Sequence, residues 1–333
     1  MADLKITVAE QNFIFPYPIL QLADRSFNEW WYNRHHDLKR IVYGVNFVHF
    51  NIGGRAEELW IDLENGFSKK IAAIYKIPYL NSAMKTGLDF DIRYQTTKQL
   101  AYRTNNDKLV FEDYSKALLN RFSTRIVLKR RKSFYGRQRL ELSYYHEKID
   151  DAIAILNPNY FLFKKTKVDY LKTSYEYIYD HRDNFIYPSI GNYFGTKISF
   201  VNYLEKEKYF QFELSSSYAY FAKIGKKFYG DINFRTKISS PNLQAWATTS
   251  AFGYRNEFVR GYDLYVIDGQ KTALFKGNFR RELINTTIKL PKGKIWKNSP
   301  NPPLNIYGKI FYDAGYVWNK FPDWNNSKLA NTY

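Results

Sequence analysis

The sequence predicts an all-β protein that folds as an antiparallel transmembrane β-barrel. Aromatic residues make up 19% of the 333 residues, with 30 tyrosines and 26 phenylalanines, and such residues favour strands. Apolar and polar residues alternate along much of the chain, as in strands that are wet on one face only. Many of these segments are roughly ten residues long, which is the length that a tilted membrane-crossing strand requires. Strands of soluble proteins average about 5–6 residues.

The alternation predicts about a dozen strands separated by turn clusters. In residues 87–94, for example, Leu88, Phe90 and Ile92 alternate with charged residues. In a barrel the charged faces would line a watery lumen and the apolar faces would contact lipid. A soluble sandwich or propeller shows the same period and remains the alternative architecture at this point. The expected strands span residues 40–51, 59–64, 71–79, 87–94, 121–129, 139–147, 167–180, 194–204, 209–222, 231–238, 271–283 and 305–318.

Composition and motifs argue against several classes of function. The net charge of +18 points first to nucleic acid, but the basic residues are interleaved with Asp and Glu, so we expect no nucleic-acid partner. The adjacent His35 and His36 would point to opposite faces of an extended chain, which does not favour a metal site. The sequence has no nucleophile elbow, phosphate loop or zinc-protease motif. We therefore expect no metal, no cofactor and no catalytic residues, and hence no enzyme.

Two short motifs stand about fifty residues apart near the end of the chain. The first is Val259-Arg260-Gly261-Tyr262, and the second, on an expected strand, is Phe311-Tyr312-Asp313-Ala314-Gly315. Further stretches at 6–31 and 179–191 precede them in a fixed order. Together these motifs resemble the BamA/TamA family of outer-membrane assembly barrels, in the form of its Bacteroidetes-type members.

The resemblance implies a site inside the barrel. In the family a loop folds back into the lumen, so we expect an inward-folded loop around 252–270 in which Arg260 pairs with Asp313. A buried guanidinium without a carboxylate would be costly, and Gly261 leaves room for the backbone or permits a positive φ. Glu282, on the intervening strand, is a candidate second acid. The stretch at 179–191 resembles a turn between two strands of the family's barrels. We expect Asp180, Arg182 and Asp183 to form a structural charge network in this turn.

The resemblance also divides the chain. Residues 1–12 are expected to form the end of the last POTRA domain, and residues 13–333 the transmembrane barrel. The chain accounts for about thirteen of the family's sixteen strands. The C-terminal strands and the POTRA domains are thus expected to be missing, either because the sequence is truncated or because another polypeptide supplies the strands.

The function implied is the non-enzymatic folding and insertion of β-barrel clients at a lateral seam, in the bacterial outer membrane. The expected partners are unfolded outer-membrane proteins, the lipid bilayer with lipopolysaccharide, and accessory lipoproteins. Two alternatives stay open, namely a dedicated secretion barrel and a solute-translocation barrel of the same superfamily.

Overall fold

The computed structural model describes residues 12–24, 26–113, 116–204, 209–254, 257–289 and 301–331. The expected end of a POTRA domain, residues 1–12, therefore lies outside the described residues except for Asn12.

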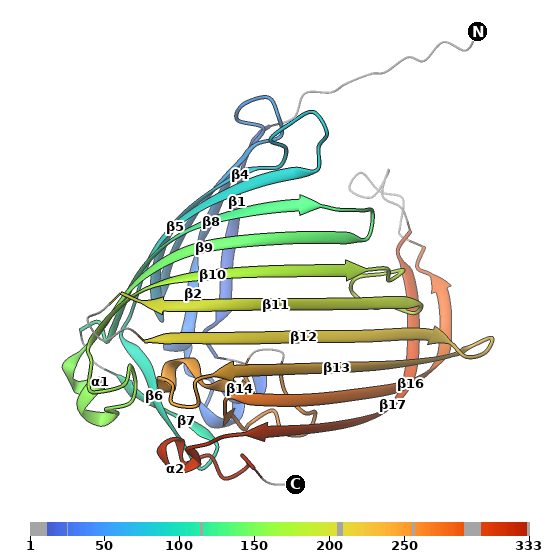
Figure 1. Ribbon diagram of the computed structural model, residues 1–333. Coiled ribbons are helices and arrows are strands. Elements are labelled where there is room, and N and C mark those ends of the chain that lie inside the picture. Colours follow the sequence, from blue (N-terminus) through green and yellow to red (C-terminus); the bar gives the residue numbers. More distant parts are fainter. Residues whose placement is uncertain are drawn as a thin grey trace.

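One antiparallel sheet of 13 strands forms the body of the molecule, and it curves around an open interior (Figure 1). The two outermost strands are β1 and β17, and among the described residues they do not pair with each other. In spatial order the sheet contains β1 (Ile14–Leu22), β2 (Ile41–Phe50), β3 (Glu58–Gly66), β4 (Ser68–Ile77), β5 (Thr86–Thr97), β8 (Leu119–Arg131), β9 (Gly136–Ile149), β10 (Lys167–Asp180), β11 (Gly191–Tyr203), β12 (Phe210–Lys223), β13 (Phe228–Ser240), β16 (Lys271–Thr287) and β17 (Pro303–Trp318).

The all-β antiparallel fold predicted from the sequence is confirmed, and each expected strand corresponds to a strand of this sheet. Strand β1 was not among the expected strands because Pro16 and Pro18 interrupt it. Proline is tolerated on an edge strand, where its nitrogen can face away from the ladder. Within the described residues β1 pairs only with β2, so it is such an edge.

The distribution of side chains across the sheet is the inverse of that in a soluble protein. On β9, Leu142 is 50% exposed on the convex face, whereas its neighbour Ser143 is 1% exposed on the concave face. The same inversion recurs on β5, where Asp91 is buried and Ile92 is exposed. A soluble sandwich would bury the apolar faces, so this architecture is excluded. An apolar outer wall around a polar interior is the arrangement of a membrane-embedded barrel. Within the described residues, no helix is long and apolar enough to cross a bilayer.

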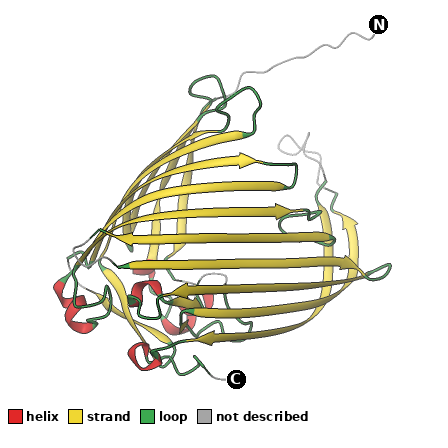
Figure 2. Ribbon diagram, in the orientation of Figure 1, coloured by secondary structure: helices red, strands yellow, loops and turns green. Residues whose placement is uncertain are grey.

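One end of the sheet carries the long connections, and all the short helices gather there (Figure 2). We call this group the loop-end cap; the opposite end, where β8 is joined to β9 and β12 to β13, is the turn end. A small apolar core built around Leu118, Ile153 and Trp246 holds the cap together. The elements of the cap are η1 (Glu29–Asn33), η2 (Leu38–Arg40), β6 (Gln99–Asn105), β7 (Lys108–Asp113), α1 (Asp151–Leu156), η3 (Trp246–Thr248), β14 (Ser250–Phe252), β15 (Ile267–Asp268) and α2 (Pro322–Asn325).

Candidate functional site

The candidate site is the contact between the barrel wall and the connection from β13 to β16. This connection, residues 241–270, is called the inner loop, and the structure describes all of it except 255 and 256. It lies against the concave face instead of projecting from the cap (Figure 1). The loop carries the first motif and β17 carries the second, so the fold brings the two sequence motifs together.

Arg260 and Asp313 form the central contact, which we call the clasp. The Nε of Arg260 donates to Oδ2 of Asp313 at 2.7 Å, and its Nη2 donates to Oδ1. The backbone N–H of Arg260 also donates to Oδ2 at 3.0 Å. The guanidinium lies over the ring of Phe311, with 4.0 Å from its central carbon to the ring centroid. The Asp313 side chain is only 2% exposed. Its hydrogen bonds come from Arg260, and Lys276, opposite it on β16, is a second cation that acts on it.

The network continues from the clasp onto two further strands. The Nη1 of Arg260 donates to Asn278 on β16 at 2.6 Å. The side-chain amide of Asn278 in turn donates to Asp231 on β13 at 2.5 Å. Arg280 completes the row, with its Nε 3.4 Å from Oδ1 of Asp231. The second acid of the network is therefore Asp231.

Glu282, the candidate second acid from the sequence, lies elsewhere. Its described hydrogen bonds come from the Tyr229 hydroxyl at 3.5 Å and the Asn285 amide at 3.4 Å. Asp231 faces the lumen in the alternating pattern of its own strand, but the sequence does not reveal the register that sets it opposite Asn278.

Two glycines allow the loop to approach the wall. Gly261 has a φ of +90°, a conformation that residues with a side chain rarely adopt. Gly315 on β17 faces the loop, and a Cβ at this position would lie 2.7 Å from Phe252 and 2.8 Å from Val259. Tyr262 closes the turn, since its N–H donates to the carbonyl of Val259 at 3.0 Å.

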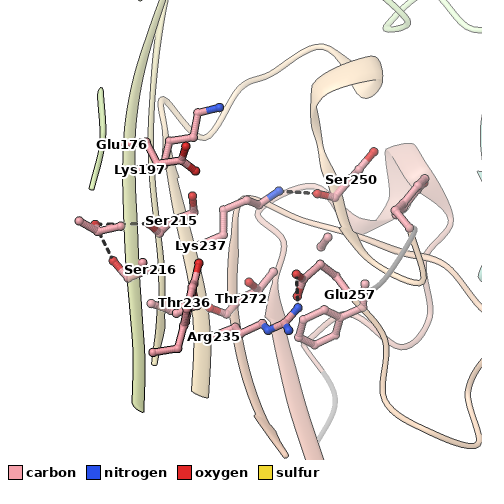
Figure 3. Close-up of a pocket in the computed structure, with 17 residues that line it drawn as sticks. Glu176, Lys197, Ser215, Ser216, Arg235, Thr236, Lys237, Ser250, Glu257 and Thr272 are labelled. Atoms are coloured by element: carbon pink, nitrogen blue, oxygen red, sulfur yellow. Dashed lines mark hydrogen bonds and ion pairs between the residues drawn. The ribbon is translucent and has the colours of Figure 1, made fainter. Parts of the chain in front are cut away.

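Other contacts fix the loop along the wall (Figure 3). The Nη1 of Arg235 on β13 lies 2.7 Å from Oε1 of Glu257, and Lys237 on the same strand donates to the carbonyl of Ser250. Between the loop and strands β10 to β13 and β16 there is a cavity of about 330 Å³. Charged and hydroxyl groups line it, including Glu176 and Lys197. The inner loop is thus a strap held by ion pairs beside a polar cavity.

The predicted turn network lies at the turn end, between β10 and β11. Arg182 donates from Nε and Nη2 to the two carboxylate oxygens of Asp180, both at 2.7 Å. Asp183 accepts hydrogen bonds of 2.8 to 3.1 Å from the backbone N–H groups of Asn184, Ser189 and Ile190. These hydrogen bonds join the two ends of the turn and fix its conformation.

The turn is also attached to the wall near the clasp. The Nη2 of Arg280 donates to the carbonyl of Pro188 at 2.7 Å, and the guanidinium lies 4.7 Å from the ring centroid of Tyr187. Arg280 therefore connects Asp231, and through it the clasp, to the turn after β10.

A comparison with known families identifies the chain. Residues 51–332 match the Omp85 superfamily domain. This chain belongs to the Omp85 superfamily. The resemblance of its motifs to the BamA/TamA-type barrels of that superfamily is thereby confirmed. No curated protein sequence matches the chain.

Solved structures agree on the fold of this Omp85 chain. It is similar to BamA from Haemophilus ducreyi lacking POTRA domains 1–3, with 12% identity and a TM-score of 0.59, over 97% of this chain and 61% of that chain. It is also similar to CdiB from Acinetobacter baumannii, with 10% identity and a TM-score of 0.50, over 84% of this chain and 47% of that one. At these identities the likeness concerns the fold alone, and the chain spans less than two thirds of either protein.

Proposed function

We propose that this Omp85 barrel inserts β-barrel proteins into the bacterial outer membrane, without covalent chemistry. The proposal is supported by the family, by the fold shared with BamA, and by the apolar convex wall. Its clients are unfolded outer-membrane proteins, and its surroundings are the bilayer with lipopolysaccharide and accessory lipoproteins. The POTRA domains of the family would deliver the clients.

The observation that carries the proposal is the outer edge of β1. The carbonyl of Phe13 accepts from the N–H of Phe50 on β2, and the N–H of Ala23 donates to the carbonyl of Arg40, just before β2. The odd positions of β1 therefore face β2 and the even positions face the open edge. Pro16 and Pro18 are both even, and neither has an N–H to donate. A strand that pairs with this edge therefore forgoes two hydrogen bonds in the middle of β1. The edge makes a weak seam.

A weak seam suits insertion by strand addition. A strand at an open edge templates the pairing of an incoming strand through backbone hydrogen bonds. The seam has to open for this, and each missing hydrogen bond lowers the cost of opening by about 1 kcal/mol. Meanwhile the clasp and its network hold the inner loop against the far strands of the sheet, β13, β16 and β17. In this mechanism Arg260 and Asp313 stabilise the barrel, and β1 is the strand that pairs with the incoming client.

The test restores the two donors in the full-length protein. We expect Pro16→Val together with Pro18→Val to slow the folding of a barrel client into liposomes about thirtyfold, because two regained hydrogen bonds of about 1 kcal/mol each strengthen the seam. Leu20→Val is the matched control, since it changes a side chain on the same edge without adding a donor. An unchanged rate in the double variant, with wild-type client folding well above that in empty liposomes, would count against the seam.

A second candidate function is translocation of a dedicated partner or a solute through the lumen. The polar cavity beside the inner loop favours it, because charged and hydroxyl side chains continue along the concave face. The two functions separate in one experiment. A translocating barrel would raise the conductance of a planar bilayer, or release a co-expressed partner, while leaving client folding at the level of empty liposomes.

A further inference from the structure

The turn end of the lumen carries cations that face one another across the ladder. Two successive rungs of the β8–β9 pair set Lys129 opposite Arg139 and Arg131 opposite Arg137. All four residues lie on the concave face, as the alternation with the exposed Leu128 and Leu140 shows. Like charges directly opposite on one face of a sheet destabilise it. A third cation, Lys85, lies beside the outer rung, since the backbone N–H of Arg131 donates to the backbone carbonyl of Lys85 at 2.7 Å.

The acids of this region leave the outer rung unneutralised. Asp89 lies 2.6 Å from the Nζ of Lys129, and Glu141 lies 3.1 Å from the Nη2 of Arg139, so the inner rung is partly paired. Within the described residues, the side chains of Lys85, Arg131 and Arg137 form no hydrogen bond or ion pair with an acid. Asp180, the acid that acts on Arg137 electrostatically, is already held by two bonds from Arg182.

These cations surround a hollow. A cavity of about 360 Å³ opens between the β4–β5 turn and strands β8 to β10. We call its charged rim the basic mouth, which consists of Lys85, Lys129, Arg130, Arg131, Arg137 and Arg139. The rim contains one acid, Glu176, and the apolar side chains of Tyr79, Met84 and Ile178 add to the lining. The surplus of positive charge calls for an anionic occupant that also offers some apolar surface.

We propose that the basic mouth binds an extended polypeptide segment with acidic side chains at alternate positions. The two cationic rungs are two residues apart along each strand, which is about 6.6 Å. Carboxylates at positions i and i+2 of an extended chain have the same spacing, so each meets one rung. A single phosphate would satisfy only one rung. The rungs lie on the concave face, away from the apolar convex wall, which favours a polypeptide over a lipid headgroup. The inference deepens the proposed function by naming the chemistry of the chain received at this mouth.

The test measures binding of synthetic peptides to the full-length protein in nanodiscs of zwitterionic lipid. One labelled peptide has Asp at alternate positions between Thr residues, and a second has the same composition with the Asp residues in one block. We expect the alternating peptide to bind more tightly, with an affinity that falls as salt is raised. Arg131→Gln with Arg137→Gln should weaken it at least about tenfold. Lys108→Gln with Lys271→Gln removes the same charge at the loop end and should leave the affinity unchanged.

Several outcomes would overturn the assignment. Equal affinity in the wild type and the Arg131/Arg137 double variant would remove the site. Equal binding of both peptides, together with displacement by millimolar inorganic phosphate, would make it a simple anion site. Loss of peptide binding when anionic lipid is added to the nanodiscs would assign it to a headgroup. A lowered melting temperature of the double variant would assign the arginines to the fold, because removing like-charge neighbours should raise it. The assay needs no insertion activity, so this inference and the proposed function can fail separately.

Discussion

Arg260 and Asp313 differ in burial, and this difference decides what each substitution does. Asp313 is 2% exposed and its partner 21%. Removing the arginine leaves a buried carboxylate with only Lys276, opposite it on β16, as a nearby cation, and breaking a buried pair costs about 3–5 kcal/mol. Removing both members leaves no such charge. The loss in free energy of unfolding on substituting one member alone is therefore mainly the cost of leaving its buried partner unpaired.

We accordingly expect Arg260→Ala to lower the free energy of unfolding by about 3–5 kcal/mol. Adding Asp313→Ala to it should recover part of that loss. The measurement is a double-mutant cycle by urea unfolding of the barrel in lipid. Arg130→Ala is the control, because this residue is exposed and faces Gln138 on the adjacent strand. Strictly additive losses would mean that the two side chains do not interact.

Gly315 offers an independent probe of the inner loop. A methyl group there would collide with Phe252 and Val259, so Gly315→Ala should detach the loop at a cost of about 1–3 kcal/mol. Gly308→Ala on the same strand meets only Leu283, at 3.6 Å, and should change the free energy of unfolding by less than about 0.5 kcal/mol. Protease cleavage within the loop, compared between the two variants, reports the detachment. Equal cleavage in both would show that the loop does not pack on Gly315.

Residues of the site that stand in sequence motifs are predictable, whereas their hydrogen-bond partners on neighbouring strands are not. The pairing of Arg260 with Asp313 could be expected because each stands in a motif of its own. Asn278 and Asp231 could not, because their contact depends on strand register across β13 and β16. A shift of one residue would turn both side chains to the lipid face. The misplacement of Glu282 has the same origin, since only the observed register sets Asp231 beside Asn278.

At the scale of elements, the loop-end cap depends on one buried acid. Asp268 of β15 accepts hydrogen bonds from Thr104 of β6 at 2.5 Å and from Tyr254 of the inner loop at 2.7 Å. Its backbone carbonyl accepts from Asn319 at 3.0 Å. The residue thus joins the β6–β7 hairpin, the inner loop and the segment after β17. Burial raises the pKa of Asp268 from its ordinary value of 3.8 to about 6; Lys237 of β13 is the cation that acts on it and opposes this shift.

This pKa makes the stability of the cap depend on pH. Because the folded pKa lies above the unfolded value, the fold favours the neutral acid. The stabilisation is complete below about pH 4 and is lost as the pH rises through about 6, by roughly 3 kcal/mol in total. We expect the urea midpoint to fall between about pH 4 and pH 7 in the wild type, and to fall much less in Asp268→Asn. An equal fall in both proteins would show that other groups titrate.

The elements that were not predicted from the sequence were missed for specific physical reasons. Strand β1 was not predicted because it contains two prolines. Prolines are tolerated there because the backbone nitrogens at even positions of β1 face away from β2 and have no partner among the described residues. The β6–β7 hairpin was not among the expected strands. Its strands pack on the cap, with Leu100 and Tyr102 buried, and they cross no membrane, so they lack the length that marked the others. Strands of the barrel were predictable because lipid and water impose opposite chemistry on their two faces.

The described part of the molecule is a curved wall with an apolar convex face and a polar concave face, against which the inner loop is held. This distribution is the physical basis for the membrane location that we propose, for the clasp, and for the basic mouth. Buried charges such as Asp91 and Glu147 are paired on the concave face, while apolar side chains such as Ile126 stay exposed on the convex face. In water such a wall would aggregate. In a bilayer it is the stable arrangement.

The most direct test of this account is a cysteine scan along β9, from Leu140 to Tyr145. The chain has no native cysteine, so each single substitution reports alone. In liposomes, a nitroxide label at 140, 142 and 144 should collide with dissolved oxygen, and one at 141, 143 and 145 with a water-soluble nickel reagent. Alternation with a period of two, in that phase, is the predicted result. Equal access of the nickel reagent to 142 and 143 would contradict the barrel, and with it the interior in which the clasp is placed.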